Sequence, residues 1–79
     1  MGHNAMLVPF ETWSAVIAHV RSGKPIWYQA PLDARPVSIL ATVRGENPRK
    51  VRVSGSRDYD AFFADSGHLD RFRQRGSES

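Results

Sequence analysis

The chain has 79 residues, a net charge of +3 and no cysteine. This length allows one domain, residues 1–79, and the lack of cysteine excludes disulfides, thiolate zinc sites and cysteine nucleophiles. No apolar run approaches the ~20 residues that span a bilayer, so we expect a soluble, cytoplasmic protein without a membrane partner. The two ends, residues 1–8 and 75–79, are expected to be disordered.

The clearest predicted element is an amphipathic helix in FETWSAVIAHVR, residues 10–21. Its apolar side chains recur at spacings of three and four, which places them on one stripe of a helix. Pro9 suits a helix start. Glu11 and Arg21 have the signs that favour the two ends of the helix dipole, and a glycine and a proline follow as a stop signal.

Three predicted strands follow, and the side chains of each alternate between two faces. They are residues 25–30, 37–44 and 50–54. Trp27 and Leu40 are the exceptions on faces that are otherwise polar. We therefore expect the helix to cover these two side chains, with Trp13 or Ile17 touching one of them.

The connection WYQAPLDARP, residues 27–36, holds two prolines on either side of a charged pair. Pro31 ends one strand, and Pro36 precedes the next, where a missing backbone donor does least harm. Asp33 is placed to accept backbone donors in the turn. The segment is interpreted as a rigid corner between two strands rather than as a loop that grips a ligand.

The segment AFFADSGHLDRFRQR, residues 61–75, is compatible with two structures. The adjacent Phe62 and Phe63 would point to opposite faces of a strand. Asp65 or Ser66 is placed to cap a short helix. A single 3₁₀ turn at GHLD, followed by a last strand at RFR, is nearly as consistent with the pattern.

This order of elements predicts an α+β fold that is mainly β. We expect an N-terminal amphipathic helix packed on a small, curled antiparallel sheet, and we favour an SH3-like barrel. The alternative is a plain three-stranded antiparallel sheet backed by one or two helices. Because residues 31–36 form a shorter loop than the first long loop of typical SH3 domains, Tudor-like or KOW-like variants are the closer comparison.

The stretch DSGHLD gathers residue types that occur in catalytic and metal sites. Ser66, His68 and two aspartates lie within six residues. Side chains so close in sequence diverge, and the usual ligand spacings are missing. We interpret the stretch as a capped turn with a surface histidine, and we expect no enzyme, no metal and no cofactor.

Positive charge is concentrated in residues 44–57, called here the basic hairpin, which hold five basic residues and one acid. Such a ridge suits contacts with phosphate. An outward aromatic side chain would add a stacking platform. The candidate binding residues are Trp27, Arg44, Arg49, Lys50, Arg52, Arg57 and Tyr59.

Two functions are compatible with these features. The first hypothesis is a non-enzymatic binding module that recognises a protein partner, because Trp13, Trp27, Phe62 and Phe63 are many large rings for a small core to bury. Aromatic residues and arginine are also enriched at the centres of interfaces. The alternative is a small nucleic-acid-binding β-barrel that uses the basic hairpin.

The segments GKPIWYQAPLDARPV and FFADSGHLDRF resemble short uncharacterised proteins of proteobacteria and their prophages. The resemblance covers roughly residues 10–73. It implies a bacterial or phage origin, and it implies no activity, ligand or site residue.

Overall fold

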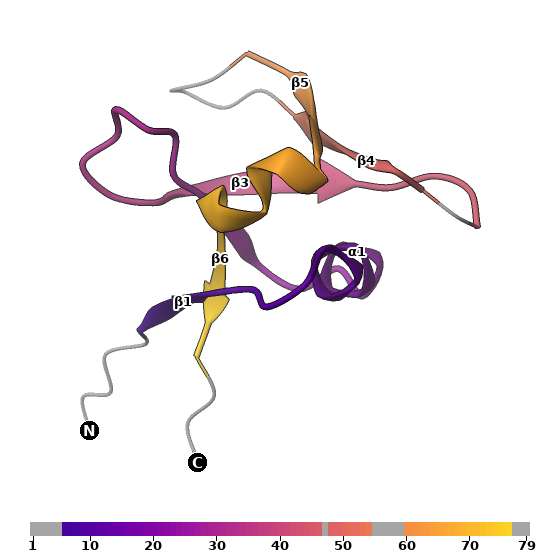
Figure 1. The fold of residues 1–79 in the computed structure, drawn as a ribbon, viewed down its shortest axis with the longest axis horizontal. Helices are drawn as coiled ribbons and strands as arrows, with labels where there is room; N and C mark the ends of the chain where they lie inside the picture. Colours follow the sequence, from indigo (N-terminus) through magenta and orange to yellow (C-terminus); the bar gives the residue numbers. More distant parts are fainter. Residues whose placement is uncertain (1–5, 47, 55–59, 77–79) are drawn as a thin grey trace.

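The computed structural model describes residues 6–46, 48–54 and 60–76. Within these residues the fold is α+β and mainly β, as predicted, and it consists of one antiparallel sheet with two helices (Figure 1). The elements are β1 (Leu7–Pro9), α1 (Trp13–Arg21), β2 (Ile26–Tyr28), β3 (Val37–Thr42), β4 (Lys50–Ser54), β5 (Phe62–Asp65), the 3₁₀ helix η1 (Ser66–Arg71) and β6 (Phe72–Arg75). The strand order is β1-β6-β2-β3-β4-β5, and the sheet is not closed.

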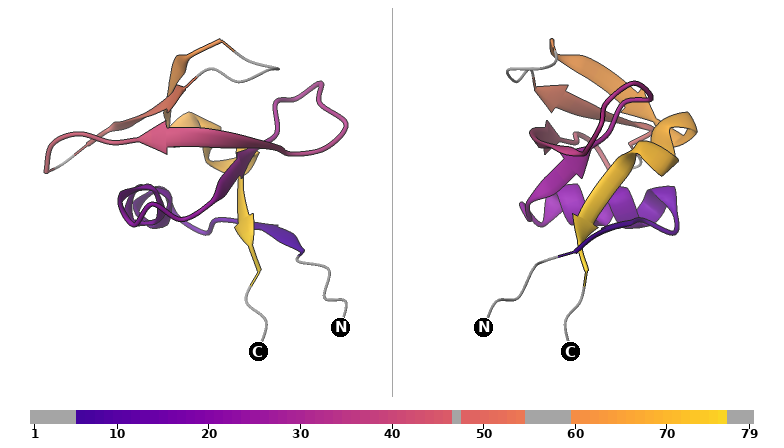
Figure 2. Two further views of the ribbon diagram at one scale, coloured as in Figure 1. Left: turned by 180° about the vertical axis from the view of Figure 1, so that it is seen from behind. Right: turned by 90° about the vertical axis from the view of Figure 1, so that its left-hand side faces the viewer.

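The sheet bends along β3, which takes part in both of its halves. The first part of β3 pairs with β2 and the second part pairs with β4. Figures 1 and 2 show β6 running at a steep angle to β3, while α1 lies beside β3. This bend gives the sheet a concave inner face that holds the core and a convex outer face.

Helix α1 begins at Trp13, three residues later than predicted. Thr12 has an extended backbone, and its Oγ1 accepts a hydrogen bond from the Ala15 N–H at 3.1 Å. This cap ends the extended segment that includes Pro9 in β1, so Pro9 does not start the helix and Glu11 precedes its first turn. The stop signal acts as predicted, because the chain turns at a glycine with positive φ after the helix.

The core lies between α1 and the inner face of the sheet. At its centre, the fully buried ring of Phe72 meets Trp13 edge-on at 5.7 Å and Tyr28 at 5.1 Å between ring centroids. The other buried apolar residues are Phe10, Val16, Ile17, Val20, Ile26, Ile39, Val51, Val53 and Ala64. The buried residues come from α1, five strands and the segment before the helix, so side-chain packing joins the helix to the sheet.

The prediction that α1 covers Trp27 and Leu40 is wrong. Leu40 is 73% exposed, and Trp13 packs on Phe72 instead. The alternation along the strands was predicted correctly, but the helix packs on the face that carries Ile26 and its β-branched and aromatic neighbours. That face offers more apolar surface to bury, and burial of apolar surface is the dominant favourable contribution to folding.

Residues 7, 8 and 75, at the ends that were expected to be disordered, belong to strands β1 and β6. Leu7 pairs with Arg75 in the β1–β6 ladder, and the Gly76 N–H donates to the Met6 carbonyl at 2.8 Å. Residues 1–5 and 77–79 lie outside the described residues. The added strand β1 extends the sheet beyond β6.

The 3₁₀ alternative for residues 61–75 is confirmed. Asp65 caps η1, because its Oδ1 accepts from the Gly67 N–H at 2.9 Å while its own N–H donates to Nδ1 of His68 at 3.2 Å. The last strand follows as β6, Phe72–Arg75, so Arg71 of the predicted strand RFR belongs to η1 instead. As predicted, Phe62 and Phe63 point to opposite faces of β5.

Asp33 holds the corner between β2 and β3. Its Oδ2 accepts from the Ala30 N–H at 3.1 Å, its N–H donates to the Ala30 carbonyl at 3.0 Å, and Gln29 Nε2 donates to its carbonyl at 3.0 Å. These bonds support the interpretation of a rigid corner.

We expect Asp33→Ala to lower the free energy of unfolding by about 1 kcal/mol, because the Ala30 N–H loses its acceptor. Urea unfolding followed by circular dichroism measures this change. Asp60→Ala, at an exposed position, is the matched control and should shift stability by less than about 0.5 kcal/mol. Equal unfolding midpoints for the two variants would contradict a bracing role for Asp33.

A candidate binding surface on the outer face of the sheet

The outer face of the sheet is the side opposite the core. The residues of the outer face are identified from the alternation of side chains along each strand, because a residue next to a buried one points away from the core. Its members are Trp27 of β2, Ser38, Leu40 and Thr42 of β3, Lys50 and Arg52 of β4, Phe63 and Asp65 of β5, and Arg73 and Arg75 of β6.

One row of the outer face brings an aromatic ring beside a cation. In the ladder, Thr42 pairs with Arg52, and Arg52 pairs with Phe63. The Phe63 ring is 63% exposed, whereas Phe62 turns inward and meets Tyr28 at 5.2 Å between ring centroids. Directly paired residues on one face of a sheet are close enough to interact, so Phe63 and Arg52 form a contiguous apolar and cationic surface.

A pocket of about 430 Å³, called here the basic pocket, lies where the outer face meets the turn of the hairpin. Four of the predicted binding residues line it: Arg44, Arg49, Lys50 and Arg52. Thr42 and Phe63 also contribute to its wall. Two other predicted binding residues, Arg57 and Tyr59, lie outside the described residues.

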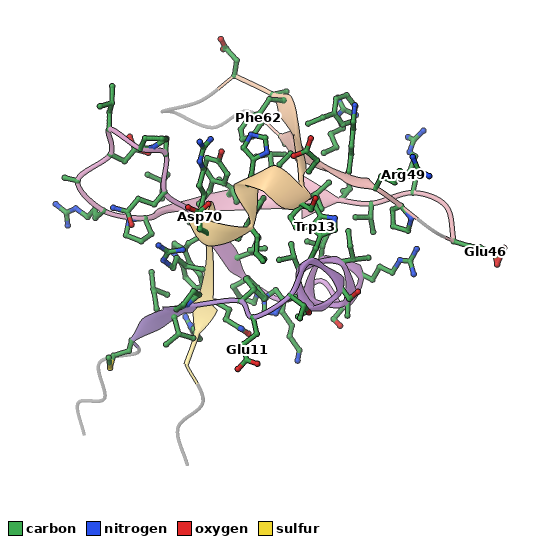
Figure 3. All side chains as sticks on the ribbon, in the orientation of Figure 1. Glu11, Trp13, Glu46, Arg49, Phe62 and Asp70 are labelled. Carbon is green, nitrogen blue, oxygen red and sulfur yellow. The ribbon has the colours of Figure 1, made fainter. Side chains whose placement is uncertain are left out.

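The basic pocket carries an excess of positive charge, with Asp65, which pairs with Lys50 in the β4–β5 ladder, as the nearby carboxylate on the same face of the sheet. None of its four cationic side chains makes an ion pair or a hydrogen bond in the described part of the chain, and no carboxylate lines the pocket. Glu46, the acid of the basic hairpin, lies at its tip (Figure 3). A concave surface lined by one sign of charge attracts a ligand of the opposite sign.

The turn of the hairpin is tied to the helix. Arg21, in the last turn of α1, donates from Nη2 to the carbonyl of Gly45. Gly45 has a φ of 87°, a left-handed conformation that glycine adopts without a steric penalty. This contact fixes the turn against α1, so the basic pocket is held in place by two elements.

Trp27 lies on the outer face, but it does not reach the basic pocket. It pairs with Ser38 and Arg73, and the guanidinium carbon of Arg75 lies 5.8 Å from its ring centroid. The structure therefore gives Phe63, and not Trp27, as the aromatic neighbour of the four cations. The pair FF in a strand was the signal for Phe63, since one of two adjacent rings must point outward.

The DSGHLD stretch serves the fold. The side chains of Asp65 and His68 form the capping box of η1, and their Oδ1 and Nδ1 atoms are 3.2 Å apart. At the end of η1, a hydrogen bond from Arg71 to the Tyr28 hydroxyl raises the pKa of the Arg71 guanidinium. The hydrogen bond from Arg71 to Tyr28 joins η1 to β2. The candidate binding surface is therefore the outer face of the sheet, and not the DSGHLD stretch.

The chain matches none of the family models, curated proteins and solved structures with which it was compared. In the part of the chain that the structure describes, neither helix has the length and apolar character needed to cross a bilayer.

Proposed function

We propose that this chain is a non-enzymatic binding module that holds a single-stranded nucleic acid on the outer face of its sheet. The observation that carries this proposal is the exposed Phe63 ring beside four cations, none of which forms an ion pair with a described residue. Single strands are bound by the same combination, a positive groove for the phosphates and aromatic rings for the bases.

Each part of the basic pocket has a partner in such a ligand. Arginine binds phosphate oxygens through two parallel hydrogen bonds, and three of the four cations are arginines. The Phe63 ring offers a flat surface to a base, and stacking on an aromatic side chain contributes about 1–3 kcal/mol per base. Phosphate contacts and stacking require no particular base sequence. The basic pocket would therefore recognise a nucleic acid because it is single-stranded, and not by its base sequence.

The packing of two of the four large rings weakens the hypothesis of a protein partner. That hypothesis rested on rings that the core would leave exposed, yet Trp13 and Phe62 pack against Phe72 and Tyr28. Trp27, which the helix was expected to bury, is instead on the outer face. Rings on the outer face suit a nucleic acid as well as a protein, so the preference for a nucleic acid depends on the four cations beside Phe63.

A protein partner is the second candidate because of one side chain. Leu40 is 73% exposed on β3, and no stacking role follows from an aliphatic side chain. Together with Phe63 it would form an apolar anchor flanked by cations, which suits an acidic protein segment with an apolar residue. An acidic peptide that binds where oligonucleotides fail would establish this candidate.

Within the α+β class, we propose that the fold is an SH3-like barrel. Three observations support it: the order β6-β2-β3-β4-β5 of the last five strands, the bend of the sheet along β3, and the short 3₁₀ helix before the last strand. Small β-barrels of this kind host many unrelated functions, so the proposal depends on the outer face and not on the fold.

The dependence of binding on salt tests the proposal. We expect oligothymidylate to bind at low salt, and the double variant Arg49→Ala, Arg52→Ala to reduce the slope of log affinity against log salt by about 1 to 2, because each phosphate contact contributes about 0.7. The matched control is Lys24→Ala, Arg35→Ala, which removes two exposed cations away from the outer face. Equal slopes for the two double variants, or no binding at low salt, would contradict the proposal.

A further inference from the structure

We infer that the bound strand continues from Phe63 across β3 to a second stacking platform, formed by Trp27 and Arg75. This inference rests on the proposed function and extends the site to the other half of the outer face. It predicts that the protein contacts bases at two separate positions.

The second platform is a ring covered by a guanidinium group. Arg75 of β6 lies over the Trp27 ring, with its guanidinium carbon 5.8 Å from the ring centroid. Within about 6 Å a guanidinium is attracted to the face of a tryptophan ring. Bases stack on tryptophan rings and on arginine guanidinium planes alike, so this pair offers a flat surface together with a charge for a phosphate.

The path between the two platforms follows the register of the strands. Trp27 pairs with Ser38 at one end of β3, and Phe63 connects through Arg52 to Thr42 at the other end. Four residues along a strand and three strand spacings across the sheet separate the platforms by about 20 Å on a flat sheet. A few nucleotides cover this distance, within the range of about 4–16 nucleotides that small barrels of the OB type bind.

The surface along this path is open to a polyanion. The outward residues of β3 are Ser38, Leu40 and Thr42, which are exposed and uncharged. Of the acidic residues that the structure describes, Asp65 alone projects from the outer side of a strand. It lies beyond Phe63, at the end of the path, where it pairs with Lys50 in the β4–β5 ladder and its carboxylate accepts a hydrogen bond from the backbone N–H of Gly67. Cations therefore stand at both ends of the path, and no described carboxylate stands between them.

The fluorescence of Trp27 reports directly on the second platform. The chain has two tryptophans, so Trp13→Phe makes Trp27 the sole emitter. The substitution keeps an aromatic contact with Phe72, and it removes a buried indole N–H that has no hydrogen-bond partner among the described residues. The fold is thus expected to tolerate it.

The experiment titrates this Trp13→Phe protein with oligothymidylates of about 4 and about 12 nucleotides, two lengths within the range of small-barrel sites. The short oligonucleotide should bind at the basic pocket, where four cations are gathered, and leave Trp27 emission nearly unchanged. The long one should quench Trp27. In the chain with native Trp13, Trp27→Ala should weaken binding of the long oligonucleotide about tenfold and leave the short one unaffected.

Leu32→Ala is the control, because Leu32 is a 98% exposed apolar residue in the loop after β2, away from the path. Binding that depends on Phe63 but never quenches Trp27 would overturn the second platform and leave the proposed function standing. Binding of an acidic peptide and of no oligonucleotide would overturn both. Should Trp27→Ala fail to fold, the quenching titration decides alone, since it retains Trp27.

Discussion

Replacing Phe72 with alanine should leave much of the protein unfolded at 25 °C. The Phe72 side chain is fully buried, and its ring meets Trp13 of α1 and Tyr28 of β2. Truncation of a buried phenylalanine to alanine costs about 3–5 kcal/mol. A domain of this size is stabilised by on the order of 5 kcal/mol, so the variant loses most of its stability.

Thermal unfolding followed by circular dichroism measures this effect, and we expect the midpoint to fall by roughly 12 to 40 °C. Phe63→Ala is the matched control, because the same truncation is made at a ring that is 63% exposed. Its effect should stay within about 0.5 kcal/mol. A midpoint for Phe72→Ala close to that of Phe63→Ala would show that the aromatic cluster does not hold α1 to the sheet.

Most of the secondary structure could be predicted from the sequence because it depends on local patterns. Period-two alternation gave the central strands, and the spacing of apolar residues gave α1. Strand β1 was missed, since Leu7–Pro9 is too short to show alternation and is stabilised by pairing with β6. Pairing between residues far apart in sequence leaves no local pattern to detect.

The side of the sheet that the helix covers could not be predicted from alternation. Alternation divides residues into two faces, but it does not say which face a distant helix will cover. The isolated Trp27 and Leu40 on polar faces suggested burial, whereas the structure places both outside. In this chain, the large apolar residues that stand alone among polar neighbours lie on the surface of the sheet and not in its core.

The candidate site was predicted in part. The charge excess of residues 44–57 is a property of composition, and four of its cations do line one pocket. Their aromatic neighbour was not identified, because which ring lies beside a hairpin depends on the register of β4 against β5. That register becomes known only from the paired strands.

Alanine at Phe62 and alanine at Phe63 should have opposite effects, although the two residues are adjacent. Phe63→Ala should weaken oligonucleotide binding roughly 5- to 150-fold, because one stacked base contributes about 1–3 kcal/mol, and should leave stability nearly unchanged. Phe62 is partly buried, and its ring lies 5.2 Å from that of Tyr28. Phe62→Ala should therefore cost roughly 2 kcal/mol of stability, with native affinity in the molecules that remain folded.

This pair of variants distinguishes the outer side of β5 from its core side, because the two variants have the same composition and net charge and differ in position by one residue. Urea unfolding gives the folded fraction of each variant, and fluorescence anisotropy of a labelled oligothymidylate at low salt gives the affinity per folded molecule. Native affinity in Phe63→Ala would remove Phe63 from the site and leave a purely electrostatic surface. Loss of affinity in Phe62→Ala alone would mean that binding depends on the shape of the core beneath β5 and not on a ring offered to a base.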